Sequence, residues 1–556
     1  MFASINATVN GSFIGRFFKM EERGTNFFTE LNGAFATFFS LAYILAVNPR
    51  ILADSGGPCV PPDGNIFAPE YEECMSDVKK EFITATAIAS MVGCFLMGIL
   101  GNLPIALAPG MGLNAYFTYS VVGWRGTGSI SYQAAVTAVA IEGVIFFVLA
   151  ITGVRFAIIR LIPEPIKTAT PAAIGAFLAH LGLQTAEGIG VVVADVATAV
   201  TLGGCPEDRR TNMTSYTEAC EEDGNKCVFS DAYTCDDLGG IMQSWTTWIG
   251  IGGLVIMAIL LAYKFKGAFL VGIAIVTGAS WFRDTAVTYF PRTYDGDSRF
   301  DYFQQYVSIE SMDTILTPYT GDLGEVWVAL FTFLYVDFLD TSGTLLALTW
   351  SMGIADRETG DFPGSRFAFA SDAIATVVGS VFGLSPVTSY IESGAGVEVG
   401  AKTGLTAVFV GIFFLCSIFF APIIASIPPW ATGGSLIIVG ALMARSLGKI
   451  KWHIPSHAIS AFVTVIMMPL TYSIAYGLIA GIAIFIIIEG TMLILSFVGI
   501  KKPVYEEGDM FGGKTASITT EKDSSPAKEM PEETEMEKAP TAIKTGGDES
   551  DFEGSV

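Results

Sequence analysis

Three acidic side chains lie inside stretches of sequence that are otherwise strongly apolar. Asp337 and Asp340 belong to the stretch LYVDFLDTSGTLLAL, and Glu392 belongs to LSPVTSYIESGAG. A helix would carry Asp337 and Asp340 on one face because they are three residues apart. A carboxylate in an apolar interior costs several kcal/mol unless it is paired, hydrated or protonated. These residues are therefore candidates for exchanging protons and for accepting hydrogen bonds from a ligand with N–H groups.

Two interruptions by proline and glycine accompany the acidic residues. In LAPGMGLNAYF and in LSPVTSYIESGAG, Pro109 and Pro386 cannot donate a backbone hydrogen bond, and Gly110 and Gly394 weaken a helix. Non-helical backbone is tolerated in a membrane only against protein or a polar cavity. We therefore expect the two breaks to meet near the bilayer midplane and to bind a small polar molecule. The alternative interpretation is that both breaks only kink helices for packing.

The composition indicates that membrane-spanning segments must position these residues. Of the 556 residues, 51% are hydrophobic and only 15% are charged, against about 25% charged in a typical soluble domain. Runs such as GLIAGIAIFIIIEGTMLILSFVGI approach the ~20 apolar residues that cross a bilayer and have no polar face. The net charge of −23 argues against a nucleic-acid partner. A large soluble protein is therefore excluded.

The hydrophobic pattern predicts an all-α polytopic membrane protein with fourteen transmembrane segments, of which the third and the tenth are short and broken. Residues 187–203 are either an interfacial segment or an extension of the fifth span. The predicted spans are 28–50, 82–104, 112–124, 131–153, 168–186, 244–263, 267–284, 325–350, 366–383, 390–400, 404–427, 431–446, 455–473 and 475–498.

An internal repeat relates the two halves of the chain. The stretch TAIASMVGCFLMG at 86–98 matches DAIATVVGSVFG at 372–383, and each copy leads into one of the breaks. Seven spans per repeat give the second copy the opposite orientation, an arrangement known from transporters. The predicted regions are an N-terminal segment (1–26), a first repeat (27–284) with cysteine loops (51–81 and 204–240), a linker (285–324), a second repeat (325–498) and a disordered acidic tail (499–556).

Cysteines and basic residues predict the orientation. Six of the eight cysteines lie in the two polar loops, which favours disulfides on an oxidising side; zinc is the competing interpretation, although neither loop contains histidine. Asn212 begins a glycosylation sequon in the second loop. Lysines and arginines flank the spans on the opposite side, which places both termini and the tail in the cytoplasm. The disulfide candidates are Cys59, Cys74, Cys205, Cys220, Cys227 and Cys235.

Three motifs together resemble a known family. APGMGLNAYF, VDFLDTSGTL and SPVTSYIESGAG are similar to motifs of the AzgA-like purine permeases of the nucleobase–cation symporter group, and the resemblance spans about residues 25–500. It implies the fourteen-helix UraA-like fold with a core and a gate domain, often as a homodimer. It also implies symport of adenine, guanine and hypoxanthine with a proton, and no cofactor beyond that coupling ion.

The resemblance also implies roles for individual residues. Asp337 and Glu392 would hold the purine, Asn114 would be the polar anchor of the third span, and Asp340 would serve proton coupling or gating together with both other acids. From the residues themselves, Tyr390 is a candidate for stacking on a flat base. Further substrate-binding candidates are Gly112, Leu113, Ser389 and Ile391.

Other buried polar residues are interpreted as structural. Glu142, Asp372 and Glu489 are predicted to be hydrogen-bond partners between helices, and Glu30 to lie near an interface. His180 is predicted to be a packing residue, because the three histidines have no metal-binding spacing.

These features together predict a proton-coupled importer of purine bases in the plasma membrane rather than an enzyme. An anion or other solute carrier on the same fold is the alternative within transport, although three acids would repel an anion. An intramembrane aspartyl protease would need its two aspartates on separate spans. A sensor that has lost transport is the remaining alternative.

Overall fold

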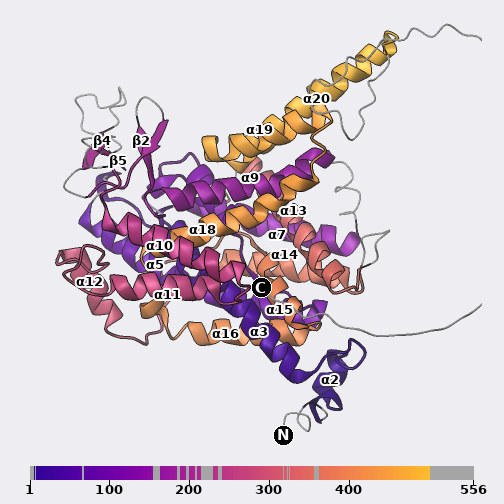
Figure 1. Ribbon diagram of the computed structural model, residues 1–556, viewed down its shortest axis with the longest axis horizontal. Coiled ribbons are helices and arrows are strands. Elements are labelled where there is room, and N and C mark those ends of the chain that lie inside the picture. The colour runs from indigo at the N-terminus through magenta and orange to yellow at the C-terminus, as the bar shows by residue number, and fades with distance from the viewer. Residues whose placement is uncertain are drawn as a thin grey trace, which may run out of the picture. The chain divides into compact units, whose positions relative to one another are not determined.

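The computed structural model shows a mostly helical chain (Figure 1). It describes residues 6, 8–64, 68–153, 163–184, 188–195, 199–206, 210–214, 229–235, 241–316, 319–321, 324, 326–355 and 362–500. The predicted acidic tail, apart from its first two residues, lies outside the described residues, as do Cys220 and Cys227.

The first half contains two long spans before the first break. Residue 26 caps α3 (Phe27–Leu41), and a two-residue turn, Ala42 and Tyr43, connects it to α4 (Ile44–Ala53). The further elements of this half are α2 (Phe13–Phe17), α5 (Pro69–Leu96), a π-helical turn (Met97–Gly101), β1 (Leu107–Pro109), α6 (Met111–Ala115), a second π-helical segment (Tyr116–Val122), α7 (Tyr132–Thr152), α9 (Glu164–Leu183), α10 (Trp245–Ala262) and α11 (Ala268–Ser280).

The second half has a corresponding order of elements. It follows α12 (Tyr294–Phe303), a short helix inside the predicted linker. Its elements are α13 (Trp327–Ser351), α14 (Ser365–Val381), β6 (Val387–Ser389), the 3₁₀ turn η6 (Ile391–Ser393), α15 (Gly394–Val399), α16 (Gly404–Ser417), α17 (Ala421–Ala425), α18 (Pro429–Met443), α19 (Pro455–Thr471) and α20 (Ile474–Phe497).

The helix lengths explain why the number of spans stays a prediction. Among the described residues, seven helices are long and apolar enough to cross a membrane, or eight if the bent pair Ile391–Val399 and Gly404–Ser417 is one span. That pair meets at 118°, and α11 and α19 are shorter apolar helices of 13 and 17 residues. The broken spans are visible in the structure, but the count of fourteen rests on the sequence.

The strands bear on the segment 187–203, for which the sequence left open an interfacial segment or an extension of the fifth span. Its described residues form no helix, because β2 (Val192–Asp195) pairs antiparallel with β3 (Ala199–Leu202). A second hairpin joins β4 (Arg210–Thr214) and β5 (Phe229–Cys235). The β-branched residues Val192, Val193, Val200 and Thr201 favour extended backbone, so the apolar pattern here belongs to strands.

The contacts between helices divide them into two groups. In one group, α9 packs closely against α18 and α19, and α10 against α11 and α18. Glycines allow the approach of α9 to α18, because a Cβ on Gly175 would lie 2.6 Å from the carbonyl oxygen of Gly440. The other group contains α3, α4, α5, α7, α13, α14 and α16.

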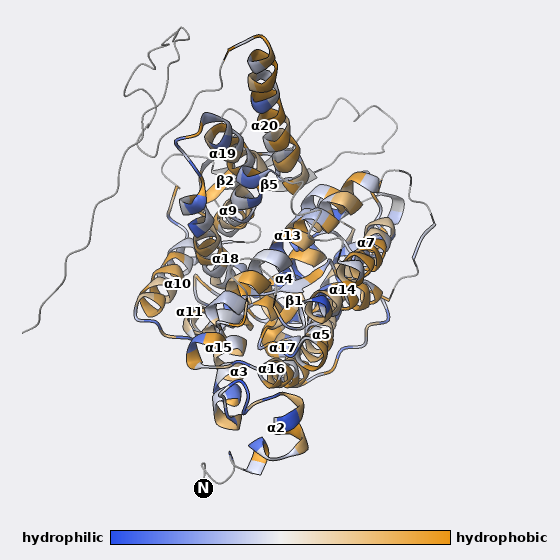
Figure 2. Cartoon of the chain, turned by 90° about the vertical axis from the view of Figure 1, so that its right-hand side faces the viewer, coloured by the Kyte–Doolittle hydropathy of each residue, from blue (hydrophilic) through white to orange (hydrophobic). Residues whose placement is uncertain are grey.

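Hydrophobic residues make up much of the outer helices α10 and α20 (Figure 2). On α20, Ile486 and Ile487 are 60% and 64% exposed, and on α10 Val255 and Ile259 are about half exposed. Such faces match a lipid environment, since water would not favour them.

Candidate functional site

The two proline-glycine breaks meet, as the sequence predicts. β1 and β6 pair antiparallel, with Ala108 opposite Thr388. Two backbone hydrogen bonds extend the pairing. Gly110 N donates to Pro386 O at 2.9 Å, and Tyr390 N, just after β6, donates to Ala106 O, just before β1, at 3.0 Å. The backbone groups freed by the breaks therefore satisfy one another, which is how unwound backbone can exist inside a membrane protein.

Small residues make room at this junction. A Cβ on Gly110 would lie 2.9 Å from the Thr388 methyl carbon, and a Cβ on Gly112 would lie 2.5 Å from Cγ2 of Ile174 on α9. Glycine is therefore required at position 112 for α9 to approach the first break. The two breaks and α9 thereby come to share one cavity.

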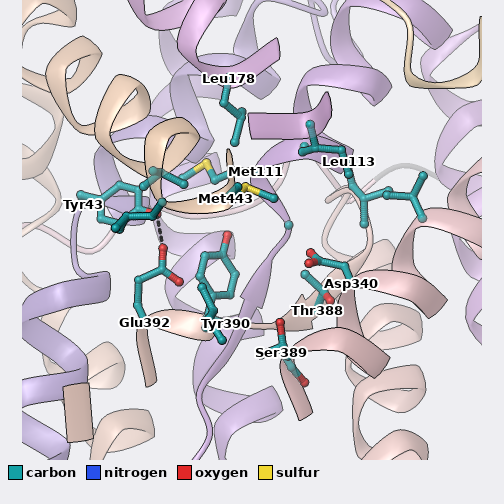
Figure 3. A pocket seen from close by; sticks show the side chains of 18 residues that line it. Tyr43, Met111, Leu113, Leu178, Asp340, Thr388, Ser389, Tyr390, Glu392 and Met443 are labelled. Carbon is teal, nitrogen blue, oxygen red and sulfur yellow. Dashed lines mark hydrogen bonds between the residues drawn. The ribbon is translucent and has the colours of Figure 1, made fainter. Parts of the chain in front are cut away.

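A cavity with about 600 Å³ of empty space opens beside the paired breaks (Figure 3). One side carries polar groups from the breaks and α13, and the other is formed by apolar side chains of α9 and α18. The lining consists of Tyr43, Gly110, Met111, Gly112, Leu113, Ile174, Leu178, Val336, Asp340, Thr344, Thr388, Ser389, Tyr390, Ile391, Glu392, Val439, Leu442 and Met443.

Two carboxyl groups and two tyrosines are the main polar features of the cavity. Figure 3 shows the Tyr390 ring between Glu392 and Asp340. The hydroxyl of Tyr43, which lies between α3 and α4, donates to Glu392 Oε1 at 3.0 Å. The Tyr390 hydroxyl donates to the carbonyl oxygen of Pro109. Both hydrogen bonds restrict the side chains to one orientation, so the cavity presents fixed acceptors beside a fixed aromatic ring.

Two of the predicted substrate-binding residues do not line the cavity. Asn114 is completely buried; it receives a hydrogen bond from Ser385 and donates one to Asn48. Asp337 is also completely buried, whereas its neighbour Asp340 lines the cavity. Residues three apart are separated by about 60° around a helix, and in this narrow site that angle decides which carboxyl group faces the cavity.

The structure brings together most of the other candidates. Gly110, Gly112, Leu113, Ser389, Tyr390, Ile391 and Glu392 all line the cavity with Asp340, while Pro109, Pro386 and Gly394 form the breaks beside it.

Several lining residues were not singled out from the sequence. The hydroxyl of Tyr43 is a polar group within an apolar span, which is a signal that could have been noticed. The apolar wall carries no such signal, because its residues resemble those of any membrane helix. The unforeseen residues are Tyr43, Met111, Ile174, Leu178, Val336, Thr344, Thr388, Val439, Leu442 and Met443.

A second, larger cavity is lined by charged residues of the loops and helix ends. At its edge Tyr289 is buried near Lys79, Arg50 and Arg299, and Lys79 donates to its hydroxyl at 3.4 Å. Burial by itself would raise the pKa of Tyr289, but the three positive charges outweigh burial and lower it to about 7. This tyrosine therefore titrates far below the usual range.

The cysteines agree in part with the predicted disulfides. Cys59 and Cys74 form a disulfide with a Cα–Cα distance of 6.1 Å, and Cys205 is also disulfide-bonded. Cys235 ends β5, and Asn212 lies in β4. In the part of the chain that the structure describes, no group of three histidine, cysteine or acidic side chains is placed to hold a metal ion.

Comparison with known proteins identifies the family. The model described as Permease family matches residues 66–203 and 246–480, more than half of the chain. The chain belongs to the xanthine/uracil permease family. This permease is thus a multi-pass membrane transporter and not an enzyme.

Named relatives cover most of the permease. It is 44% identical over 486 residues to the putative xanthine/uracil permease C887.17 of Schizosaccharomyces pombe, which covers 85% of this chain and 74% of the relative. It is 43% identical over 509 residues to the efflux pump notK' of Aspergillus versicolor, covering 88% and 85%. It is 34% identical over 468 residues to the guanine/hypoxanthine permease PbuG of Bacillus subtilis, covering 84% and 91%.

Proposed function

We propose that this permease imports purine bases, namely guanine, hypoxanthine and adenine, across the plasma membrane in symport with protons. The resemblance of its three motifs to purine permeases supports this substrate class, as does its similarity to a relative named guanine/hypoxanthine permease. The coupling ion is a proton, no other cofactor takes part, and the base crosses by alternating access.

The observation that carries the proposal is the position of Glu392 and Asp340 on either side of Tyr390 in one cavity (Figure 3). Purine bases are flat and carry ring N–H groups, and adenine and guanine also carry an amino group. Carboxyl groups accept hydrogen bonds from such donors, and an aromatic ring stacks on the flat face. The apolar wall of α9 and α18 would cover the opposite face of the base.

Residues behind the cavity serve this site indirectly in the proposal. Asn114 joins the helix after the first break to Ser385 at the second break and to Asn48 of α4. Its role is therefore to hold the two breaks in register rather than to touch the base.

An anion carrier on the same fold is disfavoured by charge. The lining contains two acidic residues and no lysine or arginine, so an anion would meet repulsion at short range. Only a measurement of base transport across the membrane distinguishes the proposed carrier from a sensor that does not transport.

Export is the second candidate for the direction of transport. It is favoured by the 43% identity to a relative named an efflux pump. Efflux of labelled base from preloaded cells, measured against uptake under the same gradient, distinguishes the two directions.

The decisive test is uptake of labelled hypoxanthine by cells that lack their own purine transport. We expect competition by unlabelled guanine and adenine, and loss of accumulation when a protonophore collapses the proton gradient. Glu392→Gln and Asp340→Asn should each abolish uptake at normal surface abundance. The matched control is Glu398→Gln, because Glu398 is an exposed acid on α15 outside the cavity. Normal uptake by Glu392→Gln would refute the site.

The proposal also includes a membrane arrangement. Both termini lie in the cytoplasm, the cysteine loops lie outside with a glycan on Asn212, and the permease forms a homodimer. An epitope at the C-terminus should therefore be detected only in permeabilised cells, and glycosidase treatment should change the mobility of wild type but not of Asn212→Gln.

A further inference from the structure

A second group of acidic residues lies behind the binding strand β6. Glu142 of α7, Asp337 of α13 and Asp372 of α14 are each completely buried. Their charges act on one another, so the three carboxyl groups are close neighbours contributed by three different helices. None of the three lines the cavity.

Two of these carboxyl groups lack the partners that a buried acid requires. None of the four carboxyl oxygens of Glu142 and Asp337 accepts a hydrogen bond from another group among the described residues, and the two carboxyl groups can hydrogen-bond to each other only when one of them carries a proton. A buried polar group without a partner is strongly unfavourable. A structural role as a hydrogen-bond partner between helices therefore does not account for them.

Other buried acids in the same chain show what a structural carboxylate looks like. Glu30 accepts hydrogen bonds from the hydroxyls of Thr25 and Thr406, both at 2.7 Å, and from the backbone amides of residues 402 and 403. Glu81 accepts from the hydroxyl and amide of Thr314 and from the next amide. Because these two carboxylates are fully satisfied as anions, the lack of a donor to Glu142 and Asp337 among the described residues distinguishes that cluster.

The third acid connects the cluster to the binding cavity. Asp372 accepts hydrogen bonds from Thr341 at 2.7 Å and from Ser389 at 3.0 Å, and Thr341 also lies 2.9 Å from the hydroxyl of Thr388. Thr388 and Ser389 are residues of β6 that line the cavity. A change of charge on Asp372 therefore acts directly on the strand that would hold the base.

The charged surroundings favour a proton as the ligand. A further acid, Asp340 on the same helix as Asp337, interacts electrostatically with Asp337 and Asp372. Glu392 of η6 interacts electrostatically with Asp340. These neighbours are acids, so the negative charges repel one another, and apolar burial adds to the penalty. A bound proton removes one charge and supplies the missing hydrogen-bond donor.

We propose that Glu142, Asp337 and Asp372 form the proton-binding site of the permease, separate from the base-binding acids Asp340 and Glu392. This inference rests on the proposed proton symport. In the proposed cycle, a proton taken up by the cluster changes the hydrogen bond between Asp372 and β6. This change alters the affinity of the β6 residues for the base.

The test separates proton-driven accumulation from exchange in proteoliposomes that contain the purified permease. For one proton per base, a gradient of one pH unit supports about tenfold accumulation of labelled hypoxanthine. In Glu142→Gln, Asp337→Asn and Asp372→Asn the accumulation ratio should fall to about one, while exchange of labelled for unlabelled base remains measurable. Thr341→Val, which cuts the link to β6 without removing a carboxyl group, should give an intermediate ratio. Asp340→Asn should lose exchange as well.

Each outcome bears on a different claim. Wild type that ignores the pH gradient refutes the proposed symport, and accumulation driven by a sodium gradient assigns the coupling to a different cation. Wild type that responds to the gradient together with folded variants that accumulate base normally refutes the proton site. The four variants change residues on three different helices, so the test remains decisive if one variant fails to fold. Thermal unfolding measured with and without base identifies the variants that are folded.

Discussion

The hydrogen bond from Tyr43 to Glu392 provides a sensitive test of the binding site. Tyr43→Phe removes only the hydroxyl that donates to Glu392 Oε1 at 3.0 Å. In the wild type this bond orients the carboxyl group and leaves its other oxygen for the ligand (Figure 3). Without it the carboxyl group can rotate, and the base must order the group when it binds.

The expected loss follows from the energy of such a bond. A hydrogen bond to a charged group contributes about 1.5–3 kcal/mol, and the cavity is partly open, so we take about 1–2 kcal/mol, a factor of about 5–30 in an equilibrium constant. The Kd for hypoxanthine of purified Tyr43→Phe should therefore rise about 5- to 30-fold. The melting temperature should change little, because the ring and its packing against Phe269 remain.

A scintillation proximity assay with labelled hypoxanthine measures this Kd directly. Tyr263→Phe is the matched control, since Tyr263 is 84% exposed and lies outside the cavity. In a double-mutant cycle, Tyr43→Phe should have little further effect once Glu392→Gln is present. A Kd within twofold of wild type in a normally folded Tyr43→Phe protein would refute the claim that Tyr43 orients Glu392 for binding the base.

Three further predictions concern packing, the outer loop and pH. Gly112→Ala should lower uptake severalfold because its methyl group would meet Ile174 at 2.5 Å, and adding Ile174→Ala should restore part of it; no restoration would contradict the steric explanation. Cys74→Ser opens a loop of 15 residues, so the melting temperature should fall with a loss of about 3 kcal/mol, and base selectivity in a competition panel should stay the same. The tyrosinate absorbance of the wild type should show a group that titrates near pH 7 and is absent from Tyr289→Phe. Because its pKa in the folded state lies below the unfolded value of about 10, the stability of wild type relative to Tyr289→Phe should rise with pH between these values, and equal pH profiles would refute this assignment.

The breaks and their acids could be found from the sequence because their signals are local. Proline and glycine within an apolar run mark unwound backbone wherever the run folds, and Glu392 is conspicuous because acids are rare in such runs. The repeat then indicated that the two breaks correspond, and the pairing of Ala108 with Thr388 confirms that they meet.

The parts that were not predicted depend on contacts between distant segments. The sequence places Asp337 and Asp340 on one helical face, but only the packing of α13 against α7 and β6 decides that Asp340 faces the cavity. Likewise, the sequence suggests that Glu142 and Asp372 are ordinary hydrogen-bond partners between helices, and only the structure shows that no group in the described part of the chain donates to Glu142. The apolar wall of α9 and α18 has no distinguishing residues at all.

The construction of the two walls indicates how the cavity could open. The polar side is joined across the repeats by the backbone pairing of β1 with β6 and by the hydrogen bond from Ser385 to Asn114. The facing side chains of α9 and α18, such as Leu178 and Met443, are apolar and form no hydrogen bonds across the cavity. Apolar contacts can slide without leaving polar groups unpaired, whereas parting the strands would expose several. We therefore expect the breaks and α13 to move as one body against α9 and α18. A crosslink across the cavity, between cysteines at Leu178 and Thr344, should block transport, whereas one joining the two breaks should permit it.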